Sequence, residues 1–155
     1  MTPVPAADFL ILDAAGAPVA TVEAKVAPPR WSRGWDEEEA RLLAAAAEDG
    51  GRFAVLISPR RLKVWDAGEP AADADAGPLL GPSFEATNTD PADVSGIAFE
   101  MICEQLMHIF TDRRPASWGD RYAAPAAYLR DVAPELADAV AGGELVAAAA
   151  GRLAA

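Results

Sequence analysis

Cysteine is almost absent from this 155-residue sequence: Cys103 is the only one, so no disulfide can form within the chain. Apolar runs are short, well below the roughly 18 residues that a membrane-spanning helix needs. The opening residues, Met-Thr-Pro-Val-Pro, lack the basic block and the apolar block of a signal peptide. We therefore expect a cytoplasmic protein without a membrane partner.

Positive charge is also scarce. Lysine and arginine together number 13 against 24 acidic residues, which gives a formal net charge of -11. Proteins that coat nucleic acid by charge alone are usually basic, because neutralising phosphates drives their binding. The composition argues against a general coating protein of this kind. It leaves open an enzyme with a local basic patch, or a subunit whose partner supplies the positive surface.

Hydrophobic residues, in contrast, make up 52% of the chain, enough for a core, and the length fits one domain. Asp36 is expected to cap a helix that Gly50-Gly51 ends. The continuously apolar run after it is typical of a strand in the middle of a covered sheet. The pattern thus predicts two hairpin strands, a helix and two further strands, at residues 9–12, 19–26, 36–47, 52–58 and 62–65.

The second half is less regular. Its first part is dense in Pro, Gly, Ala and Asp and predicts a surface connection, with at most one short strand from Leu79 to Thr87. Asp90-Pro91 is typical of a helix start, and apolar residues at helical spacing extend that helix to about Phe110. From Asp112 onward we expect Ala-rich helical pieces, broken by Pro125, Pro134 and Gly142-Gly143.

Together these elements predict a single α/β domain. Residues 1–66 would form a mixed central sheet of about four to five strands flanked by helices. Residues 67–90 would be the connection, and residues 91–155 a helical part that packs on the core.

Two acidic residues are predicted to meet across the hairpin. If its turn centres near Ala14-Ala15, paired residue numbers add up to roughly 29 to 31, which puts Asp8 beside Glu23 at about 5 Å between Cβ atoms. Asp13 would lie at the turn, more than about 20 Å away along the strand. Lys25 shares a face with Glu23, because residues two apart on a strand point the same way.

This grouping predicts a metal site. Two close carboxylates repel each other, and a divalent cation with hard oxygen ligands, Mg²⁺ or Mn²⁺, is the natural remedy. A lysine beside such a site can orient a water or stabilise charge on a phosphate. The alternative is a solvated strand face with a cross-strand ion pair.

Asp8, then 14 residues, then Glu23-Ala24-Lys25 resembles the signature of the PD-(D/E)xK nuclease superfamily, whose fold is restriction-endonuclease-like. The segments after it are similar to the N-terminal nuclease domain of type I restriction-enzyme R subunits; they are Glu39-Ala40-Arg41-Leu42-Leu43-Ala44, Phe53-Ala54-Val55-Leu56-Ile57 and Leu62-Lys63-Val64-Trp65-Asp66. The likeness covers roughly residues 5–66. It implies Mg²⁺-dependent phosphodiester hydrolysis of DNA or another nucleic acid in a restriction or defence system. It also implies that Asp8, Glu23 and the Ala24 carbonyl hold the metal while Lys25 acts on the water or the phosphate.

The sequence departs from the family pattern in three places. Pro5 is separated from the aspartate by two alanines, and related R subunits often carry glutamine at the position of Glu39. The helix that usually precedes the hairpin has no counterpart. Either a C-terminal helix or a partner chain (another protein or a second copy) takes its place, or the domain is trimmed. These departures leave open a catalytically degenerate module of the same fold that serves binding or assembly.

Two further features have competing interpretations. Arg30, Trp31 and Arg33 interleave guanidinium and indole groups, which suits nucleic-acid contact, a protein interface, or cover for the core edge. Glu39 belongs either to the site or, by preference, to a capping box with Asp36. The run Glu37-Glu38-Glu39 is expected to be a solvated first helical turn.

Overall fold

The computed structural model describes residues 7–27, 34–111, 120 and 122–147. They form a mixed α/β fold around a six-stranded sheet, so the α/β class is confirmed, with six strands instead of the expected four to five. The sheet order is β5-β4-β3-β2-β1-β6, and only β2 and β3 run parallel. The strands are β1 (Phe9–Leu12), β2 (Pro18–Ala24), β3 (Phe53–Ile57), β4 (Arg61–Asp66), β5 (Glu69–Asp75) and β6 (Glu144–Ala147).

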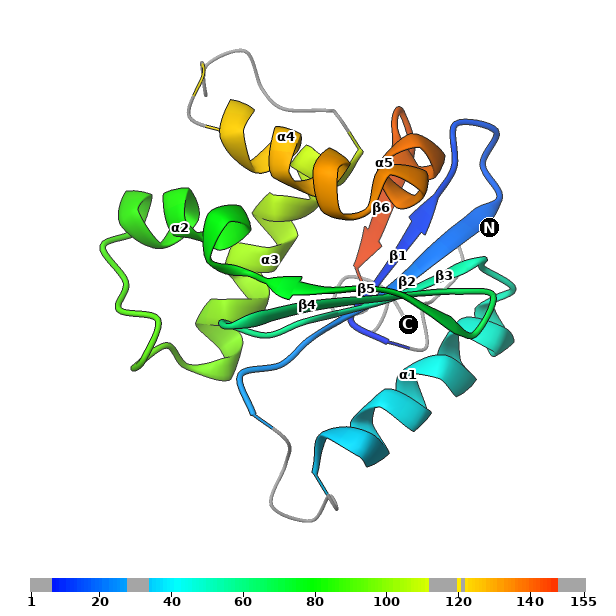
Figure 1. Cartoon of the computed structure of the whole chain (residues 1–155), viewed down its shortest axis with the longest axis horizontal. Helices are drawn as coiled ribbons and strands as arrows, with labels where there is room; N and C mark the ends of the chain where they lie inside the picture. Colours follow the sequence, from blue (N-terminus) through cyan, green and yellow to red (C-terminus); the bar gives the residue numbers. More distant parts are fainter. Residues whose placement is uncertain (1–6, 28–33, 112–119, 121, 148–155) are drawn as a thin grey trace.

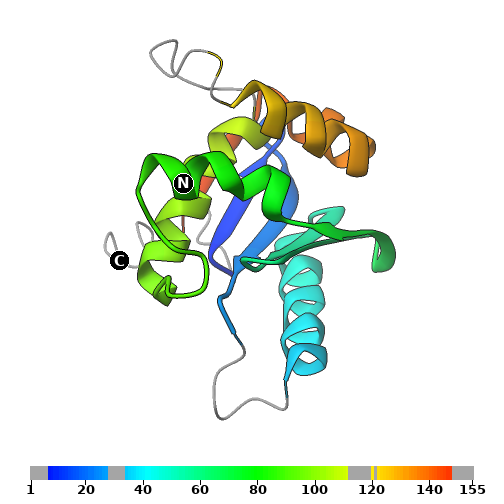
Figure 2. The same ribbon diagram turned by 60° about the vertical axis from the view of Figure 1, so that its left-hand side comes forward.

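Helices cover both faces of the sheet, and of the helices that the structure describes only α1 (Trp35–Asp49) lies on one of them (Figure 1). The opposite face carries the larger core and the other four helices, α2 (Gly77–Ala86), α3 (Gly96–Phe110), α4 (Ala123–Val132) and α5 (Pro134–Val140) (Figure 2). Because both faces are covered, β3 is buried at all five positions, as its apolar sequence predicts. No helix in the described ranges combines the length and the apolar character that a bilayer crossing needs.

The start of α1 differs from the prediction. The helix begins at Trp35, after Gly34, whose φ of 106° is one that glycine adopts without strain, and no side chain caps it. Asp36 is therefore inside the helix and is not its N-cap. The end is as predicted, because Gly50 closes the helix in the left-handed conformation with φ 79°.

Residues 67–90 are not a mere connection, since they contain β5 and α2. β5 lies at the sheet edge with mostly exposed side chains, so its sequence lacks the apolar alternation of a strand. The segment from Leu79 to Thr87, where the sequence allows one short strand, belongs mostly to α2, which also contains Pro82. Burial of Leu79, Leu80 and Phe84 against the core outweighs the low helix propensity of Pro82.

The long helix α3 ends at Phe110 as predicted but starts later than Asp90-Pro91. Ser95 is its N-cap, with the hydroxyl accepting a hydrogen bond from the Ala98 N–H at 3.2 Å. Asp90 instead accepts from the Ala92 N–H within a turn.

The C-terminal part contains the expected helices α4 and α5, and then an unexpected strand. β6 pairs antiparallel with β1 and so extends the sheet beside the N-terminal hairpin. Gly143 makes this approach possible, because a Cβ there would lie 2.1 Å from the Leu12 carbonyl oxygen.

Candidate metal and catalytic site

The hairpin brings Asp8 to Glu23. β1 and β2 pair in the register Phe9 to Val22, so the preceding residue, Asp8, lies beside Glu23. The residue numbers of each pair, 9 with 22 and 8 with 23, add up to 31, within the predicted range of roughly 29 to 31. Asp13 lies at the turn, where its carboxylate accepts hydrogen bonds from two backbone N–H groups, each at 2.9 Å.

The Asp8 carboxylate is fixed by the backbone of β2. Its Oδ2 accepts a hydrogen bond from the Ala24 N–H at 2.9 Å. The next residue, Lys25, donates its N–H to the Ile57 carbonyl in β3. Because successive residues of a strand direct their backbone groups to opposite sides, the Ala24 carbonyl lies on the Asp8 side. The register thus places the Asp8 carboxylate and the Ala24 carbonyl on the same side of β2, next to Glu23.

Lys25 lies between two carboxylates on the α1 face of the sheet. Its Nζ is 3.3 Å from Glu23 Oε1 and 3.6 Å from Glu38 Oε2. Glu38 is only 3% exposed, although it belongs to the first turn of α1. Arg41 approaches the other oxygen of Glu38 at 3.4 Å. A cavity of about 170 Å³ opens here, lined by Ala7, Glu23, Lys25, Glu38, Arg41, Leu42 and Ala45.

The pKa values of Glu23 on β2 and of Lys25 directly after it are both shifted. Burial, and then the charge of Asp8, raise the pKa of Glu23 to about 7, against the opposing effect of Lys25. Burial alone would lower the pKa of Lys25, but the carboxylates of Glu23, Glu38 and Asp8 together raise it above its ordinary value. Lys25 is therefore an ammonium near neutral pH, while Glu23 exchanges its proton there.

This donor set fits a hard divalent cation. Burial is the main cause of the raised pKa of Glu23, and the charge of the neighbouring Asp8 adds to it against the opposing effect of Lys25. Mg²⁺ is commonly held by one or two carboxylates and keeps several of its waters. Within the described ranges no cluster of three or more His, Cys, Asp or Glu side chains could hold a metal ion. Any cation here would rely on Asp8, Glu23 and the Ala24 carbonyl, with water completing its shell.

Glu38, which sequence reasoning had assigned to a solvated turn, is the acid that reaches Lys25. Glu39 has a different partner, because its Oε1 lies 2.5 Å from Lys63 Nζ. It makes no capping box with Asp36, which lies inside the helix. A signal for Glu38 was present in the sequence: it precedes Leu42 by four residues, so both lie on the helix face that packs on the sheet.

The structure does not place most of the remaining candidate residues. Arg30, Trp31 and Arg33 lie outside the described residues, as does Pro5. Cys103 is fully buried in α3, and burial raises the pKa of its thiol, so it is not a nucleophile. Comparisons with protein-family models, with curated proteins and with solved structures find no match for this chain.

Proposed function

We propose that the chain hydrolyses phosphodiester bonds in nucleic acid with the help of Mg²⁺ or Mn²⁺, as a nuclease or nuclease subunit of a restriction or defence system. The observation that carries this proposal is the pair of carboxylates on neighbouring strands with an ammonium beside one of them. Asp8, Glu23 and the Ala24 carbonyl would hold the cation. When bound, the cation would make a water more acidic and polarise the phosphate.

Lys25 would act on the reacting groups. In the hydrolysis a water oxygen forms a bond to phosphorus, the bond from phosphorus to the leaving oxygen breaks, and a proton passes from the water to that oxygen or to solvent. An ammonium held near the water or a non-bridging oxygen stabilises the negative charge that develops. Glu38 holds this ammonium from the helix side at 3.6 Å and is thus a positioning residue.

Cleavage of labelled oligonucleotides with Mg²⁺ or Mn²⁺ tests the proposal. We expect Asp8→Asn, Glu23→Gln and Lys25→Met each to lower the rate by at least about 100-fold, as loss of a group acting at the transition state does. Asp13→Asn is the matched control, because asparagine supports the same turn. Equal rates for Asp8→Asn and Asp13→Asn would contradict the assignment.

A catalytically degenerate binding or assembly module is the second candidate. It is favoured by the ion pairs that already engage Lys25 on both sides. Calorimetric titration with Mn²⁺ separates the two candidates. A nuclease site gives heat of binding that Asp8→Asn abolishes, whereas a degenerate module gives none and cleaves nothing.

A further inference from the structure

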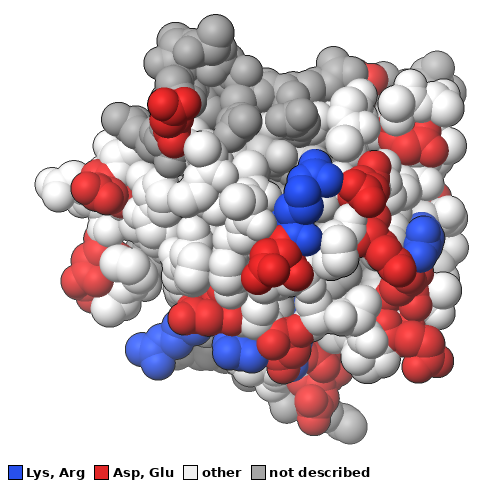
Figure 3. Space-filling view, turned by 45° about the horizontal axis from the view of Figure 1, so that its top comes forward, with Lys and Arg blue, Asp and Glu red and all other residues white. Residues whose placement is uncertain are grey.

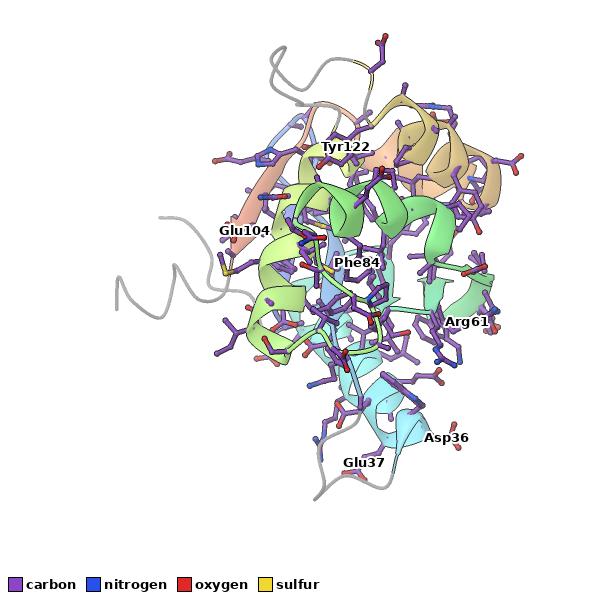
Figure 4. The ribbon with its side chains drawn as sticks, turned by 90° about the vertical axis from the view of Figure 1, so that its left-hand side faces the viewer. Asp36, Glu37, Arg61, Phe84, Glu104 and Tyr122 are labelled. Carbon is purple, nitrogen blue, oxygen red and sulfur yellow. The ribbon has the colours of Figure 1, made fainter. Side chains whose placement is uncertain are left out.

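A second, larger cavity lies at the end of the sheet where β3 turns into β4. Its volume of about 420 Å³ falls in the range of roughly 300–1,000 Å³ that small-molecule sites occupy. Figure 4 labels two residues of this region, Arg61 on the sheet and Asp36 at the start of α1. The lining comprises Val26, Trp35, Glu39, Leu56, Ser58, Pro59, Arg60, Arg61, Lys63, Pro91 and Ala92.

The charge of this cavity is opposite to that of the molecule. Arg60, Arg61 and Lys63 line it with a single acid, Glu39, in a chain whose net charge is -11. Acidic side chains are spread over the face of the molecule drawn in Figure 3, where basic ones occupy few places. A concentrated group of cations on such a molecule favours an anionic ligand.

One of these cations is available for that ligand. Lys63 pairs with Glu39 at 2.5 Å, and Arg61 Nε pairs with Asp73 at 3.0 Å. Arg60 is exposed, and among the described residues no side chain pairs with its guanidinium. Trp35 lines the same cavity and supplies an aromatic surface. A ligand with both a negative charge and a flat ring would engage the two features together.

The cavity is next to the candidate site. Across the sheet Glu23 pairs with Leu56, and Leu56 pairs with Lys63, so these three side chains share the α1 face. Two strand spacings amount to about 10 Å. On the helix side, Glu38 contacts Lys25 whereas its neighbour Glu39 contacts Lys63. The first turn of α1 thus contacts both sites.

We propose that this cavity binds one unpaired nucleotide of a single-stranded nucleic acid that also occupies the candidate site. The base packs against Trp35, and the guanidinium of Arg60 contacts a phosphate. The nucleotide is unpaired because a base within a duplex is stacked on both faces and cannot enter a cavity of this kind without being flipped out. This inference rests on the proposed function and assigns its substrate as single-stranded.

The test measures binding of a fluorescein-labelled 12-nucleotide single strand by anisotropy in chelator, where the metal site plays no part. We expect Arg60→Ala to weaken binding about tenfold, the loss that a charged hydrogen bond produces. Trp35→Leu, which keeps an apolar side chain, should weaken it at least about fivefold through lost stacking. A duplex of the same sequence should bind more weakly than the single strand.

Arg130→Ala is the control, since it removes the same charge from α4, where Arg130 pairs with Asp138. It should leave binding unchanged. The inference is overturned if Arg60→Ala binds as wild type does, if the duplex binds as tightly as the single strand, or if wild type does not bind. Cleavage assays keep the two proposals apart. If the protein cleaves in a metal-dependent way and Arg60→Ala changes neither cleavage nor binding, the cavity has no part in the mechanism. If binding depends on Arg60 but no cleavage occurs, the cavity assignment stands and the proposed nuclease activity is wrong.

Discussion

The charge of Asp8 acts unfavourably on the neighbouring Glu23 carboxylate. Asparagine at this position keeps the oxygen that accepts the Ala24 N–H but removes the repulsion with Glu23. We predict that Asp8→Asn stabilises the metal-free protein by about 0.5–2 kcal/mol, as relief of functional strain commonly does. Thermal melts in chelator should show a higher Tm, and the upshift with Mg²⁺ should be lost. A lower Tm with the Mg²⁺ response intact would make Asp8 a structural residue.

Glu23 makes the stability depend on pH. Its pKa rises from an ordinary value of 4.5 to about 7, so between these values the folded state binds more protons than the unfolded state. The free energy of unfolding therefore falls as the pH rises from about 4.5 to 7, and it is flat above that window as far as Glu23 is concerned.

Glu23→Gln should remove this dependence. We predict that the variant gains stability relative to wild type as the pH increases from 5 to 8, because glutamine has no proton to lose. Urea unfolding in chelator across this range measures the difference. A difference that does not change with pH would mean that Glu23 titrates with its ordinary pKa.

At the scale of the element, α1 is attached to the sheet by two neighbouring ion pairs that differ in burial. Glu38 is 3% exposed in its pair with Lys25, whereas Glu39 is 20% exposed in its pair with Lys63. We predict that Glu38→Gln lowers the free energy of unfolding by about 1–3 kcal/mol and that Glu39→Gln costs under about 1 kcal/mol. Urea unfolding of both variants is the measurement, and equal costs would contradict the buried role of Glu38.

β6 depends on the absence of a side chain at Gly143. Alanine there would place Cβ 2.1 Å from the Leu12 carbonyl oxygen, so backbone must move. We predict that Gly143→Ala costs at least about 2 kcal/mol and loosens the β1 and β6 pairing, seen as faster amide hydrogen exchange in both strands. Gly96→Ala is the control: it lies in the first turn of α3 with open space around it, and it should leave the stability unchanged or raise it by up to about 1 kcal/mol. Unchanged exchange in Gly143→Ala would contradict the close approach.

The elements that sequence reasoning found are those whose signal is local. The spacing of apolar residues along the sequence predicts the β1–β2 hairpin, the buried strand β3 and the apolar face of α3. The pairing of Asp8 with Glu23 then follows from the hairpin. The missed strands carry little apolar signal of their own, because β5 is an exposed edge strand and β6 has only four residues. β5 is held by backbone pairing with β4, and β6 by pairing with β1 across more than 130 residues of chain. Glu38 was missed because its burial depends on how α1 docks.

For the whole molecule, the central question is how a chain with a net charge of -11 could hold a polyanion. Its overall field repels nucleic acid, so attraction has to come from a few cations in one place. The cavity beside β4 offers three, and two of these are already paired with acids. This arrangement predicts that the affinity for nucleic acid depends only weakly on salt. Most of the binding free energy would then come from stacking and from the fit of the nucleotide in the cavity.

Salt dependence measures this balance directly. Single-strand binding releases about 0.7 counterion per neutralised phosphate, so three cations set an upper limit near −2 for the slope of log K against log salt. We predict a slope between about −0.7, the value for Arg60 alone, and about −2 for the wild type, and a slope closer to zero by about 0.7 for Arg60→Ala, whereas Arg130→Ala leaves it unchanged. Anisotropy titrations between about 50 and 200 mM salt give these slopes. A slope much steeper than −2 would require cations beyond this cavity, because three contacts cannot release that many ions.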